Sequence, residues 1–293
     1  MNEKFLLQFT PERWSPEQKF FQFVGVSKCF GPEAQKGART CSDHIGKFDI
    51  LVGLANRIAP DLQKDHDELD ANGHSKNRYH REFTAMLEGM ISEIYSGLDG
   101  VRRLLFSVYR HVKGIQNHST EAMFNRATNA SYGEGLPQEI LDALKDANEA
   151  WFPRLRSLRT EIAHGEIGTC HLDRETKKIR YMHSGIPGSE AHRAFIIDDV
   201  ISEIEIWRSG SVKLRDVVFK VMCGLFEQEP LFQMCGMYKA RWYGRFVVPS
   251  QKLSFDDGYC VSRKWFMNDT ELKCPLRSRC RAFENEWDGP VPW

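Results

Sequence analysis

The stretch Trp151–Gly165, WFPRLRSLRTEIAHG, decides how the rest of this 293-residue chain is interpreted. Leu155, Leu158 and Ile162 recur at helical spacing, and a glycine follows His164 at once. This pattern predicts a short basic helix that ends at its glycine. Arg159 and His164 are separated by four residues in the last turns of that helix.

A long amphipathic helix is predicted upstream of this stretch. Its apolar residues recur in steps of three and one, which indicates a single buried stripe over several turns. The stripe comprises Phe83, Met86, Leu87, Met90, Ile91, Ile94, Tyr95, Leu98, Val101, Leu104, Leu105, Val108 and Tyr109.

The wording Leu-Arg-x-x-Arg-Thr-Glu-Ile-Ala-His-Gly, together with this upstream helix, resembles the HEPN superfamily of helical-bundle proteins. The resemblance implies an antiparallel bundle in which the long helix lies against the motif helix. It further implies a homodimer that brings two R-x4-H motifs into one cleft. Many members are metal-independent endoribonucleases, so RNA is the implied substrate. A toxin or antiviral-defence role, with an antitoxin or defence-system partner, is implied as well.

RNA cleavage without a metal needs proton transfer at two oxygens and a cation for the charge on phosphorus. His164 can transfer the proton near neutral pH, and the Arg159 guanidinium matches phosphate oxygens. Arg156 and Glu161 are expected to support this pair. Thr160 stands where the family commonly has asparagine, and it keeps a hydroxyl but lacks the amide.

Two other interpretations fit the same residues. Basic side chains near a helix end often only cap its carbonyl groups. A HEPN bundle can also bind a nucleotide or a partner protein without cutting RNA. A catalytic motif should leave Arg159 and His164 accessible, whereas a structural one should bury them with satisfied partners.

The expected fold is mainly α. A HEPN-like bundle occupies residues 42–228, after an N-terminal segment 1–41 with a strand at Phe20–Val26. A β-hairpin is inserted after the motif helix, at 167–172 and 179–182. The last helical segment, from Asp198 to Leu225, is expected to break near Ser209–Ser211. Residues 61–80 and 114–136 are predicted to be polar connections. The histidines of 61–80 are expected to be solvated rather than to bind a metal ion.

A small α/β or irregular extension is expected at 229–293, where aromatic, basic and cysteine residues replace helical periodicity. Tyr238–Phe246 alternates basic and aromatic side chains, so Lys239, Arg241, Trp242 and Arg245 are candidates for binding nucleic acid. An edge strand with buried aromatics fits the same alternation.

Four cysteines of this extension, Cys235, Cys260, Cys274 and Cys280, are weak candidates for a structural zinc site. No C-x2-C pair is present, and free thiols are the favoured alternative.

The overall composition of the chain does not identify a binding partner. Forty Lys and Arg balance forty Asp and Glu, so net charge predicts neither a nucleic acid nor a membrane surface. The N-terminus has no secretory pattern, and no apolar run has membrane-spanning length. The eight cysteines are therefore expected to be reduced thiols or metal ligands, rather than disulfides, in a cytoplasmic protein.

Overall fold

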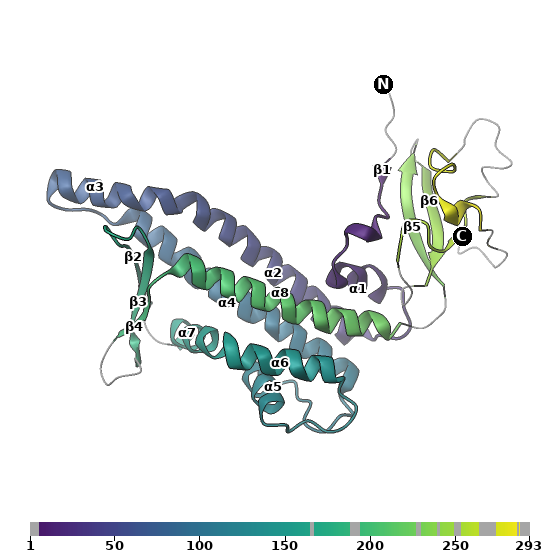
Figure 1. Ribbon diagram of the computed structural model, residues 1–293, viewed down its shortest axis with the longest axis horizontal. Helices are drawn as coiled ribbons and strands as arrows, with labels where there is room; N and C mark the ends of the chain where they lie inside the picture. Colours follow the sequence, from purple (N-terminus) through teal and green to yellow (C-terminus); the bar gives the residue numbers. More distant parts are fainter. Residues whose placement is uncertain are drawn as a thin grey trace. The chain divides into compact units, whose positions relative to one another are not determined.

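The computed structural model describes residues 6–164, 167–187, 194–226, 230–238, 241–248, 253–263, 274–285 and 287. This part of the chain is mainly helical, as predicted, and carries two small antiparallel sheets (Figure 1). Within it, no helix combines the length and the apolar character needed to cross a membrane. The chain divides into two units, Lys36–Arg215 and a second made of Met1–Gln35 with Asp216–Trp293.

This division differs from the expected one. The N-terminal segment and the C-terminal extension were predicted to be separate, yet they belong to the same unit because β1 (Leu6–Leu7) pairs with β5 (Leu231–Tyr238). The unit boundaries fall within α2 (Pro32–Ile58) and α8 (Val200–Gly224).

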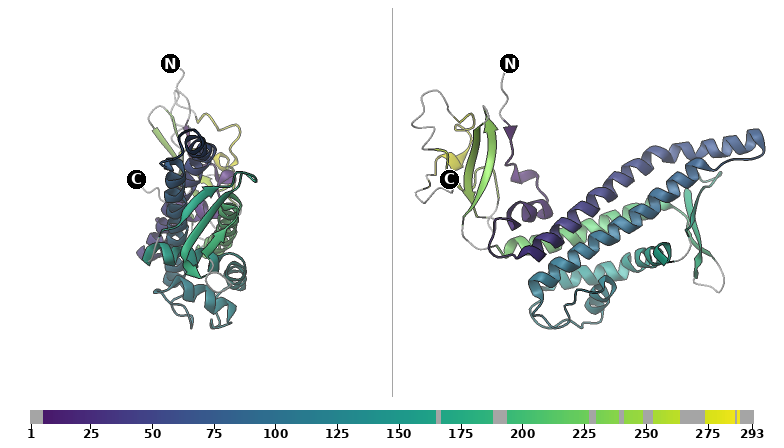
Figure 2. Two further views of the ribbon diagram at one scale, coloured as in Figure 1. Left: turned by 90° about the vertical axis from the view of Figure 1, so that its left-hand side faces the viewer. Right: turned by 180° about the vertical axis from the view of Figure 1, so that it is seen from behind.

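The larger unit is built on α4 (Arg78–Tyr109), the predicted long helix. Its stripe is buried as expected, from Phe83 through Ile94 to Leu105. Helix α2 lies alongside α4 (Figure 2), and the two backbones come close at glycines. A Cβ on Gly100 would lie 2.4 Å from the Cys41 amide nitrogen, and one on Gly37 would lie 2.7 Å from that of Leu104. Only glycine permits this contact.

Three segments of this unit differ from the sequence prediction. The polar stretch 61–80 forms α3 (Leu62–Asn72) and the first turn of α4, and the connection 114–136 contains α5 (Thr120–Thr128). Helix α8 continues through Ser209–Ser211. Gly210 does not break it but leaves room for Trp151, since a Cβ there would lie 2.4 Å from the indole nitrogen.

Helices α6 (Gln138–Ala150) and α7 (Phe152–His164) follow in sequence. The backbone leaves helical geometry at Trp151, whose φ is −130°, and Pro153 lies in the first turn of α7. A proline is tolerated there because a position in the first turn of a helix needs no amide donor.

A three-stranded sheet, ordered β2-β3-β4, lies at one end of these helices (Figure 1). The expected hairpin is present as β2 (Thr169–Leu172) and β3 (Ile179–Pro187), with Cys170 opposite Tyr181. Strand β4 (Ala194–Ile197) adds to β3, so β2 is an edge strand of the described sheet.

The other unit contains α1 (Pro16–Val24) and a sheet ordered β1-β5-β6-β7. The strands β6 (Arg241–Val247) and β7 (Tyr259–Cys260) complete this sheet. A strand was predicted at Phe20–Val26, and this was wrong. Ser15 and Gln18 form a reciprocal cap that starts a helix, and Phe20 packs at 5.0 Å from Phe30.

The glycine contact between α2 and α4 gives a first prediction. Gly100→Ala should lower the free energy of unfolding by about 1–3 kcal/mol, because the methyl group meets backbone that cannot move aside. Gly46 lies on the exposed side of α2 with nothing within 4 Å, so Gly46→Ala should raise it by about 0.5–1 kcal/mol. Denaturant unfolding followed by circular dichroism measures both. Equal effects of the two substitutions would contradict this packing.

Candidate functional site

Helix α7 is held against α4 by its apolar face. Phe152, Leu155 and Leu158 are buried, and the Phe152 ring stacks on Phe124 at 3.8 Å and on Tyr95 of α4 at 6.0 Å. The predicted contact between the long helix and the motif helix is therefore confirmed. This packing leaves the other face of α7 to carry its charged residues.

The arginines of α7 fall into two kinds. Arg154 pairs with Glu203 at 3.4 Å, and Arg156 pairs with Glu121 at 2.9 Å. Arg159 lies over the Tyr95 ring, with its guanidinium carbon 4.9 Å from the ring centre. No hydrogen bond or ion pair joins Arg159 to the described part of the chain. Its charge is therefore held in place by an aromatic face while its donors stay uncommitted.

His164 is the last residue of α7, and its side chain is exposed. It makes no hydrogen bond with the described residues, nor do Thr160 and Glu161, both half-buried one turn earlier. Gly165, the predicted stop, lies outside the described residues. The half-buried Arg159 and the exposed His164 thus lie near the same end of α7.

The phenol of Tyr95 is close to this arginine. Burial raises the pKa of Tyr95, Asp99 raises it further, and the charge of Arg159 opposes the shift. Tyr95 therefore stays neutral and presents its ring to the cation. Sequence analysis placed Tyr95 on the core stripe and missed this contact, because the pairing of the two helices determines it.

The strand after α7 is attached to α4 by a series of hydrogen bonds. The amides of Gly168, Cys170 and Leu172 donate to Glu88 Oε1 at 2.9 Å, Thr84 Oγ1 at 2.9 Å and His80 Nε2 at 3.1 Å, respectively. Every second residue of an extended strand advances by about 6.7 Å, and every fourth residue of a helix by about 6.0 Å. The two periods match closely enough for three successive bonds.

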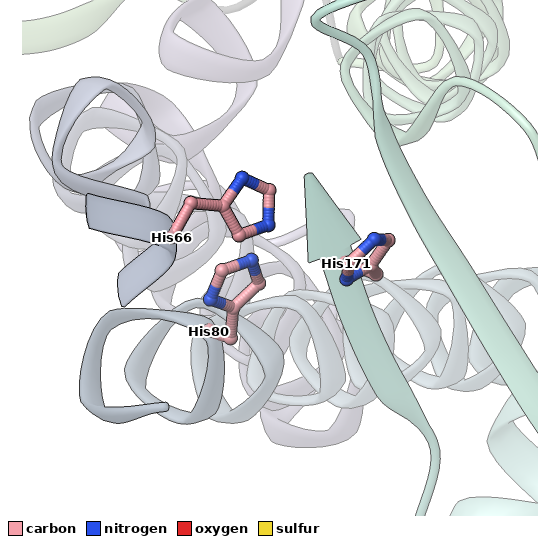
Figure 3. A group of neighbouring side chains, drawn as sticks. All are labelled: His66, His80 and His171. Carbon is pink, nitrogen blue, oxygen red and sulfur yellow. The ribbon is translucent and has the colours of Figure 1, made fainter. Parts of the chain in front are cut away.

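A histidine cluster lies at the end of this series, apart from the motif. The rings of His66 and His80 are 5.3 Å apart, and His171 stands 5.3 Å from the first and 5.7 Å from the second (Figure 3). Sequence analysis treated His66 and His80 as solvated, yet each is only 4% exposed. His74 does not join them. His171 was missed, since alternation along β2 gives no hint of what faces it.

The basic and aromatic candidates of the tail are separated by the structure. Tyr238–Phe246 spans two paired strands, and β6 lies between β5 and β7 rather than at an edge. Trp242 is 44% exposed, Lys239 lies outside the described residues, and Arg241 is described by its backbone alone.

Arg245 does not fit a role in binding nucleic acid. Its side chain is 2% exposed and lies 4.6 Å from the Phe9 ring and 4.7 Å from the Phe255 ring. The guanidinium donates to the Phe255 carbonyl and, at 3.6 Å, to Cys280 Sγ. The expected phosphate contact at Arg245 is therefore corrected to a buried structural one.

Cys235, Cys260, Cys274 and Cys280 line one small cavity together with Arg245. Burial raises the pKa of each of the first three thiols, to about 12 for Cys260, whereas Arg245 opposes the shift at Cys235. Four sulfur ligands match the number that structural zinc requires, but zinc also requires thiolates about 3.8 Å apart. Within the described residues, the one group of three or more potential metal ligands that the structure brings together is the histidine cluster, not these cysteines.

No protein-family model, curated protein or solved structure matches this chain.

The attachment of β2 to α4 gives a second prediction. Thr84→Val should lower the free energy of unfolding by about 1–3 kcal/mol, because the buried Cys170 amide loses its acceptor while the side-chain volume stays the same. Ser92→Ala, at an exposed position of α4, should change it by less than about 0.5 kcal/mol. Amide hydrogen exchange should locate the weakening at β2. Unchanged protection of Cys170 in the valine variant would rule out this bond.

Proposed function

We propose that this protein is a metal-independent endoribonuclease of the HEPN type, with Arg159 and His164 as its catalytic residues. The observation that carries the proposal is the contrast along α7. The side chains of Arg154 and Arg156 form ion pairs. The side chains of Arg159 and the exposed His164 make no hydrogen bond with the described residues. A purely structural motif would bury both side chains with satisfied partners.

The proposed reaction is attack by the ribose 2′-oxygen on the adjacent phosphorus. The bond from phosphorus to the 2′-oxygen forms, and the bond to the 5′-oxygen breaks. One group takes the 2′-hydroxyl proton and another gives a proton to the departing 5′-oxygen. The products are a 2′,3′-cyclic phosphate and a 5′-hydroxyl. Arg159 stabilises the charge on the phosphoryl oxygens, and His164 transfers a proton.

One motif supplies a single histidine, whereas the reaction needs both an acid and a base. We therefore include in the proposal the homodimer that the family resemblance implies. Two copies of α7 would place two arginines and two histidines at one phosphate. Glu161 is the group on the same turn that would orient His164. An antitoxin or another defence-system component is the class of partner that would restrain such an activity.

The second candidate is a HEPN module that binds a nucleotide or a partner protein without cutting. Thr160 favours it, because the family commonly has asparagine at this position and threonine offers no amide. The same accessible arginine and histidine would then hold a phosphate group without transferring a proton. Binding without cleavage distinguishes this candidate from the first.

Cleavage of a total-RNA or tRNA pool in EDTA tests the proposal. The parent should cut and leave 2′,3′-cyclic phosphate ends, whereas Arg159→Ala and His164→Ala should each lose about 100-fold or more of the rate. Arg154→Ala is the matched control on the same helix, and it should cut at nearly the parental rate because it removes partly exposed contacts, among them the ion pair with Glu203 and the hydrogen bond to the Ile196 carbonyl.

Light scattering on the same samples should give a mass of two chains. If the parent binds RNA but leaves it intact, the non-catalytic candidate replaces the enzyme. If His164→Ala cuts as fast as the parent, the assignment of the catalytic residues is wrong.

A further inference from the structure

The histidine cluster brings together three elements of the larger unit. His66 comes from α3, His80 from the first turn of α4, and His171 from β2. One ring nitrogen of each lies within 4.8 Å of the other two. Figure 3 shows a nitrogen of His66 and a nitrogen of His80 directed toward the space between the three rings, with His171 on its other side.

His66 has no hydrogen-bond partner for either ring nitrogen among the described residues, although its side chain is almost fully buried. Polar groups buried in this way are nearly always paired. Burial, followed by the charges of His80 and Arg174, lowers the pKa of His66, so its ring is neutral at pH 7. A neutral imidazole with an unshared lone pair is the form that binds a metal ion.

His80 has a carboxylate behind it. Asp65, 3% exposed, accepts from the His80 backbone amide at 2.9 Å and from Nδ1 at 2.7 Å. This arrangement puts the proton on Nδ1 and the lone pair on Nε2, and the same carboxylate-to-imidazole contact orients histidine ligands of zinc. A buried carboxylate also requires nearby positive charge, which a divalent cation on His80 would supply.

His171 completes the set from the solvent side. The residue as a whole is exposed, but partial burial of its ring, followed by the charge of His80, lowers the pKa of His171. His80 and His171 also line an open pocket with Thr84, Glu88 and Arg81. A ligand held by these rings would therefore have one side open to this pocket.

We propose that His66, His80 and His171 bind one divalent transition metal ion of the zinc type, with its fourth coordination position open to the pocket. Three imidazole nitrogens suit zinc, cobalt, nickel or copper rather than magnesium or calcium, which prefer oxygen. In a tetrahedral zinc site the nitrogens lie about 3.3 Å apart. Binding would therefore require the side chains to move closer together from their present separations of up to 4.8 Å.

Metal binding has a structural consequence at β2. The Leu172 amide donates to His80 Nε2 at 3.1 Å, and a metal ion would take the same lone pair. The loaded protein should therefore release the Leu172 amide while the Cys170 amide stays bonded to Thr84. This difference separates a metal bound at His80 from a metal bound elsewhere.

Zinc content after chelation, reloading and dialysis of the full chain tests the proposal. His171→Ala should lose one zinc ion per chain relative to the parent, and His66→Ala should lose the same one. His74→Ala is the matched control, since His74 is exposed, bonds only the Asn72 carbonyl and lies outside the cluster. Cys274→Ser should also leave this ion in place, so any metal in the cysteine cavity is counted separately.

Two further measurements keep the test decisive if His66→Ala fails to fold. Cobalt bound at this site should give visible absorption without thiolate charge transfer, and His171→Ala should abolish it. Zinc should speed hydrogen exchange at Leu172 in the parent but not in His171→Ala. Equal zinc content in the parent and His171→Ala, or unchanged Leu172 exchange on loading, would falsify the site. RNA cleavage in EDTA is independent of either outcome.

Discussion

The hydrogen bonds from the amides of Gly168 and of β2 to Glu88, Thr84 and His80 are the constraint on which this part of the molecule depends. An edge strand has amides that no neighbouring strand satisfies. Here a helix satisfies them, because three acceptors recur at every fourth residue of α4. The same bonds hold the chain to α4 from Gly168 to Leu172. Because α4 also carries the Tyr95 ring under Arg159, one helix supports both ends of the motif.

The two candidate sites share this scaffold but differ in kind. At the end of α7 the half-buried Arg159 and the exposed His164 have side chains without hydrogen bonds to the described residues, which suits a large substrate that approaches from solvent. At the histidine cluster two of the three side chains are buried, and one is oriented by Asp65, which suits a small ion. His80 belongs both to the histidine cluster and to the attachment of β2, because it faces His66 and its Nε2 accepts from the Leu172 amide. Changes at the cluster can thereby reach β2, and β2 follows the motif helix directly along the chain.

Local sequence predicted those parts that depend on a single periodic pattern. The stripe from Phe83 to Tyr109 identified α4, and the helical spacing of Leu155, Leu158 and Ile162 identified α7. The strand predicted at Phe20–Val26 was wrong because its aromatic content outweighed the Ser15–Gln18 cap, a helix signal that was present in the sequence. Gly210 was taken for a break, although its role depends on Trp151, a residue far away in the chain.

The two candidate sites also differ in whether local sequence alone could predict them. Arg159 and His164 could be named as candidates from the sequence because they lie on one helix within one motif. The histidine cluster was not, because His66, His80 and His171 meet only after α3, α4 and β2 have packed together. Arg245 was wrongly expected to be exposed, for a related reason. Alternation along a strand predicts two faces, but it does not show that β6 lies between two other strands or that aromatic rings cover Arg245.

The most direct measurement is a nuclear magnetic resonance titration of the histidine rings with a 2′-O-methyl RNA, which lacks the attacking hydroxyl. The His164 signal, assigned by its loss in His164→Gln, should shift until binding saturates, while the signals of His66 and His80 stay in place. If RNA binds and His164 does not shift, or if only the histidine cluster responds, the end of α7 is not the RNA site.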